Sequence, residues 1–114
     1  MNRSGQAVRE ARDFYKVAEQ DLMVVHDDID LGLGKIKLDF DAGAAGHRGV
    51  TSIIDELGTK AFYRIRLGIG RPARKEEVED YVLSPFRPEE LEEVDGMIQK
   101  GAEMVKKWIL GETQ

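Results

Sequence analysis

The chain has 114 residues, of which 41% are hydrophobic and none is cysteine. This length predicts one domain, spanning residues 1–114, with a single modest core. The lack of cysteine excludes a disulfide framework, a thiolate metal site and a cysteine nucleophile. No apolar run approaches the roughly 20 residues that span a bilayer, and the N-terminus has no apolar signal-peptide core. We therefore expect a soluble, cytoplasmic protein.

The net charge of −5 argues against a simple nucleic-acid binder, but the charges are unevenly distributed. Residues 35–75 carry 9 basic and 4 acidic side chains, whereas residues 76–114 carry 4 basic and 11 acidic ones. A basic block of this kind can hold a phosphate while the acidic remainder limits nonspecific RNA binding. Composition alone leaves open a second interpretation, in which basic residues only crowd a few exposed strand faces.

The first half of the chain predicts a helix followed by two strands. Ser4 stands where an N-cap belongs, and apolar residues recur at helical spacing through Val17. Residues 22–26 predict a strand and residues 28–34 an irregular connector. Residues 35–40 alternate basic and apolar side chains, as a strand with one wet face does.

The second half predicts two further helices around another strand. Residues 50–57 predict a helix that stops at Gly58, and residues 62–69 predict a strand. A short helix is expected at residues 78–82. The apolar stripe from Leu91 to Ile109, preceded by Pro88, predicts the longest helix. The pattern is that of an α/β protein with helices flanking a sheet.

The most informative stretch is Leu22 to Asp30, because an apolar strand ends in one imidazole and three carboxylates. In open α/β sheets, ligands collect at the carboxyl ends of strands. Asp27 could orient a histidine from elsewhere in the fold, as acids do in hydrolytic dyads. The three carboxylates could equally bind Mg²⁺ or Ca²⁺, or serve only as turn caps.

Gly46-His47-Arg48-Gly49 opens the helix at residues 50–57, so backbone donors and a cation meet there. This arrangement fits an anion or carbonyl site. The alternative is that the glycines only let the loop enter the helix, with His47 as its cap. An amide near the chain start, Asn2, could contact a bound carbonyl or water, but a terminal asparagine is more often a mobile end or a cap.

Two strands carry basic pairs at a spacing of two residues, which places each pair on one strand face. If the strands are neighbours, the pairs form a four-cation patch suited to phosphate. The pairs are Lys35 with Lys37 and Arg64 with Arg66.

Together these motifs resemble the bacterial type of peptidyl-tRNA hydrolase. The matching segments are Met-Asn-x-Ser-Gly at the start, Val-Val-His-Asp-Asp-Ile-Asp-Leu, Gly-His-x-Gly, and Phe-x-Arg-Ile-Arg-Leu-Gly-Ile-Gly-Arg-Pro, followed by Asp-Tyr-Val-Leu-x-x-Phe. The resemblance implies a mixed sheet flanked by helices and hydrolysis of the ester joining a peptide to tRNA. It implies no cofactor, no metal and a monomer.

The resemblance also implies residue roles. Asn2 would contact the substrate and help place the attacking water, and Asp27 would orient the catalytic histidine. His47 would line the pocket. Lys37 and Arg66 would hold the 5′-phosphate of the tRNA acceptor stem. Arg48 stands where the family often has asparagine, which suggests a guanidinium contact in place of water positioning.

The family's N-terminal strand, its Gly-Asn-Pro-Gly loop and its Arg-His-Asn segment with the catalytic base have no counterpart here, and neither His26 nor His47 matches that base. We therefore expect the chain to correspond to the C-terminal portion of the family fold, without its first strand, and to be inactive alone. The alternatives are a non-catalytic RNA-binding module of the same fold and, last, a carboxylate metal site.

Overall fold

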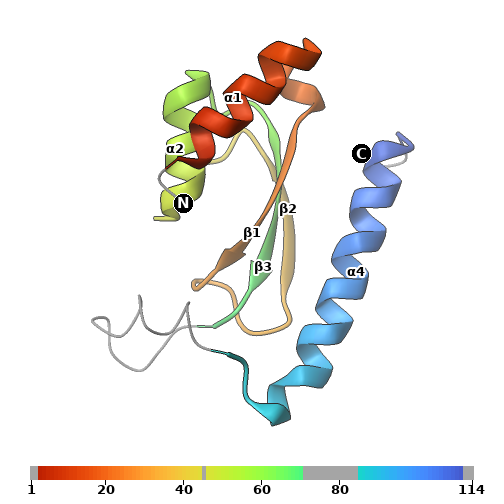
Figure 1. The fold of residues 1–114 in the computed structure, drawn as a ribbon. Helices are drawn as coiled ribbons and strands as arrows, with labels where there is room; N and C mark the ends of the chain where they lie inside the picture. The colour runs from red at the N-terminus through yellow and green to blue at the C-terminus, as the bar shows by residue number, and fades with distance from the viewer. Residues whose placement is uncertain (1–2, 45, 71–84, 112–114) are drawn as a thin grey trace. The chain divides into compact units, whose positions relative to one another are not determined.

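A computed structural model describes residues 3–44, 46–70 and 85–111. In chain order its helices and strands are α1 (Ser4–Tyr15), β1 (Met23–Asp28), β2 (Ile36–Phe40), α2 (Arg48–Leu57), β3 (Tyr63–Gly68) and α4 (Leu91–Ile109), as Figure 1 shows. Short 3₁₀ turns lie at Glu19–Asp21 and Pro88–Glu90. The six expected helices and strands within these ranges are confirmed. The helix expected at residues 78–82 lies outside the described residues.

The three strands form one mixed sheet in the order β1-β3-β2. β1 and β3 are parallel, because the amides of Tyr63 and Ile69 donate to the carbonyls of Leu22 and Asp28, respectively. β2 and β3 are antiparallel, since the amide of Gly68, at the end of β3, donates to the carbonyl of Lys35, just before β2, and the amide of Asp41, just after β2, donates to the carbonyl of Phe62, just before β3. The expected α/β class with a mixed sheet is thus confirmed.

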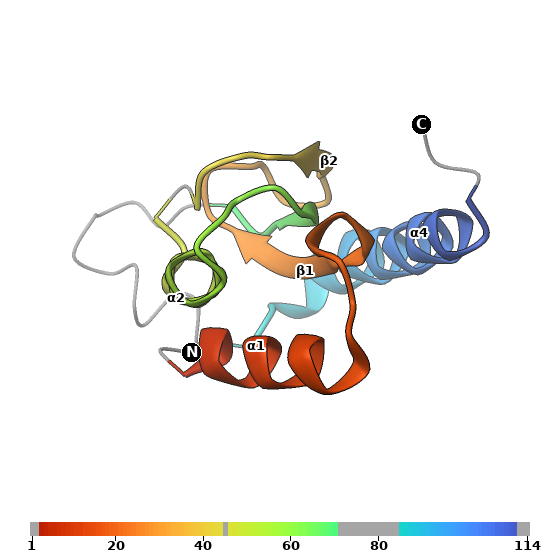
Figure 2. The same cartoon turned by 90° about the horizontal axis from the view of Figure 1, so that it is seen from above.

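The chain divides into two compact units, the first formed by Met1–His26 with Leu38–Arg66 and the second by Asp27–Lys37 with Leu67–Gln114. In the first unit α1 and α2 lie side by side (Figure 2). Its core contains Ile53, Leu57 and Phe62, with further apolar side chains from α1 and β1 packed against them. Ile53 and Leu57 are one helical turn apart on α2, so burial of this face supports the helix where the sequence predicts it.

Gly5 explains how closely α1 and α2 approach each other. A Cβ atom added at Gly5 would lie only 2.1 Å from the carbonyl oxygen of Ser52. The Gly5 amide donates a hydrogen bond of 3.0 Å to the hydroxyl of Ser52. Glycine therefore lets the two helices meet at backbone distance.

In the second unit, α4 buries Val94, Met97 and Gly101. These positions recur every three to four residues and form one helix face, as the apolar stripe predicts. Gly101 faces Leu67 of β3, since a Cβ atom there would lie 3.5 Å from the leucine side chain. Within the described residues, no helix is both long and apolar enough to cross a membrane.

The predicted N-cap at Ser4 is wrong. Ser4 is the first helical residue, and Arg3 precedes the helix without a side-chain hydrogen bond to its amides. The first turn is instead held by the contact between the Gly5 amide and Ser52 of α2. A tertiary contact thus replaces the local cap that the sequence pattern predicts.

Candidate functional site

The acidic block at the end of β1 is partly explained by turn formation. β1 extends two residues beyond the predicted His26, because the carbonyl of Asp28 still accepts a hydrogen bond from Ile69. The side chain of buried Asp28 accepts from the amide of Asp30 at 2.8 Å, which makes an Asx turn. Turn chemistry therefore accounts for Asp28. Asp27 is intermediate in exposure, and alternation along the strand places it on the opposite face from His26.

His47 caps α2. Its Nδ1 accepts a hydrogen bond of 3.2 Å from the amide of Val50, so the predicted cap is confirmed. An accepting Nδ1 places the proton of the neutral imidazole on Nε2, which becomes a donor. The ring packs edge-on against buried His26, with 4.8 Å between ring centroids. Gly46 has a φ of 80°, a conformation that glycine adopts without strain and that lets the loop turn into the helix.

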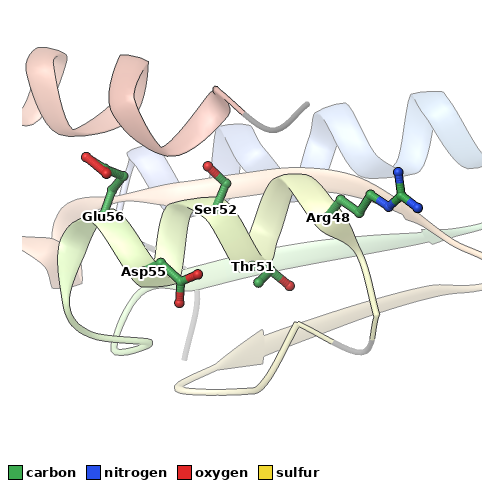
Figure 3. A pocket seen from close by; sticks show the side chains of 5 residues that line it. All are labelled: Arg48, Thr51, Ser52, Asp55 and Glu56. Atoms are coloured by element: carbon green, nitrogen blue, oxygen red, sulfur yellow. The ribbon is translucent and has the colours of Figure 1, made fainter.

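An open groove of about 380 Å³ runs along the exposed side of α2. It is lined by Arg48, Thr51, Ser52, Asp55 and Glu56, which Figure 3 shows projecting from successive turns of the helix. Arg48 supplies a positive charge near the N-terminal end, and Asp55 and Glu56 supply negative charges further along. Glu56 is itself held by Arg9 of α1 at 2.8 Å. The groove thus has opposite charges at its two ends.

The expected pair of exposed arginines on β3 is wrong for Arg64. Arg64 is completely buried, with its guanidinium 4.2 Å from the centroid of the Phe62 ring. Its guanidinium donates to the carbonyl oxygens of Lys60, Phe62 and Ala42. Burial lowers the pKa of Arg64, and the nearby carboxylates of Asp39 and Asp41 partly oppose this shift. Arg64 therefore binds backbone carbonyl groups and is not part of an exposed four-cation patch.

Arg66, in the first unit, is only partly exposed, and its guanidinium is already paired with a carboxylate. Its Nη1 lies 2.9 Å from Oδ2 of Asp39, and the two side chains are only 17% and 18% exposed. The sequence interpretation missed Asp39. The available signal was the spacing of Asp39, which stands two residues after Lys37 and four after Lys35 and so falls on the same face of an extended chain.

The remaining expected site residues are distributed between the units. Lys37 is exposed on β2 and belongs to the second unit, as does Asp27. Arg66, His47 and Arg48 belong to the first. Asn2 lies outside the described residues, as do Arg71, Arg74 and Lys75 of the basic block. Among the described residues, no group of three or more acidic or histidine side chains is arranged to hold a metal ion.

Fold and site together define an α/β protein with a mixed sheet, a histidine-capped helix and basic strands. The sequence model of the peptidyl-tRNA hydrolase family matches residues 1–114. The chain therefore belongs to the peptidyl-tRNA hydrolase family.

Individual relatives agree with this assignment. The chain is 44% identical over 108 residues to a peptidyl-tRNA hydrolase of Desulfitobacterium hafniense, a match that covers 95% of this chain and 58% of the relative. It is 45% identical over 109 residues to that of Shouchella clausii, covering 96% of this chain and 59% of the relative. The crystal structure of the Acinetobacter baumannii enzyme superposes with a TM-score of 0.91 at 36% identity, covering 98% of this chain and 57% of that one. The chain thus spans less than two thirds of the length of these relatives.

Proposed function

We propose that this chain supplies the orienting acid and the tRNA contacts for hydrolysis of the ester bond between a peptide and tRNA. The observation that carries the proposal is the family match over the whole chain. The partly exposed carboxylate of Asp27 and the donor nitrogen of His47 supply suitable chemistry. The product would be a free peptide and a tRNA that can be charged again.

Each residue has a distinct role in this proposal. Ester hydrolysis needs a base to take a proton from the attacking water, and Asp27 would hold a histidine base in its accepting tautomer. Asn2 would help place the water. The Nε2–H of His47 would donate to a substrate carbonyl, and Arg48 would contact the substrate at the opening of the α2 groove.

The tRNA contacts in the proposal are cationic. Lys37 and Arg66 would bind the 5′-phosphate of the acceptor stem by charge-assisted hydrogen bonds. The basic excess of residues 35–75 supports an anionic ligand at this part of the chain. We further propose that the protein acts as a monomer in the cytoplasm, without a metal ion, because a histidine-activated water needs none.

The test distinguishes a catalytic role of Asp27 from a structural one. The chain is assayed alone, and also joined to the part of the Shouchella clausii relative that lies outside the matched residues. We expect negligible hydrolysis of peptidyl-tRNA by the chain alone and measurable hydrolysis by the fusion. General-base catalysis contributes on the order of 10²–10⁴ in rate, so Asp27→Asn in the fusion should lower kcat by a large part of that factor while tRNA affinity stays nearly unchanged.

Asp28→Asn is the matched control, because its carboxylate serves the Asx turn and has no proposed catalytic role. Equal losses in kcat and tRNA affinity for Asp27→Asn would show that Asp27 is structural. Hydrolysis by the chain alone that survives Asp27→Ala would contradict the assignment.

A non-catalytic RNA-binding module is the second candidate. The exposed basic side chains of Lys37 on β2 and of Lys35, just before β2, favour it. This function predicts RNA binding by the chain and no hydrolysis by the fusion, so the same pair of proteins distinguishes the two candidates.

A further inference from the structure

The proposed phosphate ligand Arg66 has an internal anionic partner. Nη1 of Arg66 donates to Oδ2 of Asp39 at 2.9 Å, between neighbouring strands of the sheet. Both side chains are more than four fifths shielded from solvent. An ion pair with this degree of shielding is screened less by salt and water than a surface pair. A phosphate that approaches Arg66 therefore meets a guanidinium whose charge is already partly neutralised.

Asp39 also faces a second arginine. Besides its bond to Arg66, it lies near enough to the buried guanidinium of Arg64 to favour that group's charged form. The carbonyl groups around Arg64 accept hydrogen bonds from its Nη1 and Nη2 but bring no negative charge. Asp39 thus provides counter-charge to two arginines at once, one buried and one near the surface.

We propose that Asp39 sets the affinity of Arg66 for phosphate by occupying its guanidinium in the unbound protein, so that an RNA phosphate binds by exchange with this carboxylate. The inference rests on the proposed tRNA contact of Arg66. Two anions cannot both be fully matched by one guanidinium, because the carboxylate and phosphate repel each other at that distance. The ion pair therefore lowers the affinity for any phosphate and makes weak, nonspecific contacts unfavourable.

The probe is a fluorescent RNA hairpin that copies a tRNA acceptor stem and ends in either a 5′-phosphate or a 5′-hydroxyl. Its affinity is measured by anisotropy at fixed salt for the unaltered chain and for Asp39→Asn, Arg66→Gln and the double variant. Asparagine keeps the size of Asp39 and removes its charge. Glu10→Gln on exposed α1 is the control for the same change in net charge.

We expect Asp39→Asn to bind the 5′-phosphorylated hairpin roughly tenfold more tightly, which is the size of one charge-assisted hydrogen bond. The gain in affinity from Asp39→Asn should be much smaller with the 5′-hydroxyl hairpin, and also when Arg66→Gln is present. Glu10→Gln should give a much smaller gain with the 5′-phosphorylated hairpin. Circular dichroism and urea unfolding of each variant check that the fold is retained.

Two results would overturn the inference, and they differ in what they say about the site. If Arg66→Gln abolishes the preference for 5′-phosphate but Asp39→Asn changes nothing, the phosphate contact stands and Asp39 has no control over it. If Asp39→Asn tightens binding equally with Arg66→Gln present, the effect is one of overall charge and does not act through Arg66. If Arg66→Gln also keeps the preference for 5′-phosphate, Arg66 is not the phosphate ligand.

Discussion

Arg64 joins the start of β3 to the loop before α2 through hydrogen bonds to backbone carbonyls. Its guanidinium donates to Lys60 and Phe62 on one side and to Ala42 on the other. Ala42 begins the glycine-containing loop that leads to His47, the cap of α2. A residue that never reaches the surface therefore helps to place the candidate site.

We predict that Arg64→Ala lowers the free energy of unfolding by about 3 kcal/mol, because it removes the guanidinium hydrogen bonds to the carbonyls of Lys60, Phe62 and Ala42 and the cation near Asp39. Arg64→Lys should recover only part of this loss, since one ammonium cannot reproduce the planar fork of donors. Urea unfolding provides the measurement. Lys100→Ala, at an exposed position of α4, should stay within about 0.5 kcal/mol. A similar small change for Arg64→Ala would show that water replaces the guanidinium at no cost.

For single residues, sequence patterns predict the direction of a side chain better than they predict its burial. The spacing of Arg64 and Arg66 correctly indicates a strand, but it suggests that both are exposed. Only Arg66 approaches the surface. The difference arises because the Arg64 guanidinium lies against the loop carbonyls of Ala42, Lys60 and Phe62 and donates to them. This contact depends on how residues distant in the chain meet. The same reasoning applies to Asp39, whose partner is 27 residues away.

At the scale of elements, the contact between α1 and α2 depends on Gly5, which has no side chain. We predict that Gly5→Ala lowers the free energy of unfolding by about 2 kcal/mol, because its Cβ atom would clash with the backbone of Ser52 and the helices would have to separate. Gly96→Ala in α4 is the matched control, since a Cβ atom there meets nothing within 4 Å. It should stabilise the protein by about 0.5–1 kcal/mol. Thermal or urea unfolding of both variants would reveal opposite signs, and a gain for Gly5→Ala would mean that the helices do not pack at backbone distance.

A second element-scale prediction concerns the start of α4. The Glu90 carboxylate accepts a hydrogen bond of 2.9 Å from the amide of Arg87. This bond and the Arg87 side chain lower the pKa of Glu90 below its ordinary value of 4.5. The cap's stabilising contribution is therefore complete above about pH 4.5 and is lost as the pH falls through the lower pKa of the folded state.

NMR titration provides the measurement for this cap. The carboxyl carbon of Glu90 and the amide of Arg87 should shift together, with a shared midpoint below 4.5. The transition at the Arg87 amide should disappear in Glu90→Gln. Separate midpoints for the two signals would show that the hydrogen bond does not persist in solution.

The helices illustrate which elements can be predicted from local pattern. The apolar stripe of α4 predicts a helix by its periodicity. The apolar residues of α2 do the same, and Gly58 marks where that helix ends. The structure contains both helices. The start of α1 is less predictable, because Ser4 is a good cap by composition but the first turn is bonded to another helix. Local rules fail where a tertiary contact satisfies the same amides.

At the scale of the whole molecule, the acidic chain is proposed to bind an anionic ligand through a locally basic segment. With a net charge of −5, long-range attraction to RNA is weak, so affinity must come from a few close phosphate contacts. Each such contact releases condensed counterions and makes the logarithm of the binding constant fall with the logarithm of salt concentration. The number of contacts can therefore be read from the slope.

We predict that Lys37→Ala and Arg66→Ala each reduce this slope by about 0.9, the value for one phosphate contact on a duplex. Lys100→Ala, which removes an exposed cation from α4, should leave the slope unchanged. Anisotropy titrations of the acceptor-stem hairpin between about 50 and 200 mM salt provide the measurement, the range over which multi-contact binders lose most affinity. With a 5′-hydroxyl hairpin, both substitutions should become nearly silent, because the phosphate they are proposed to hold is gone. If they stay costly there, Lys37 and Arg66 contact another part of the RNA. If Lys100→Ala changes the slope as much as they do, attraction is spread over the whole surface and no two residues form a specific phosphate site.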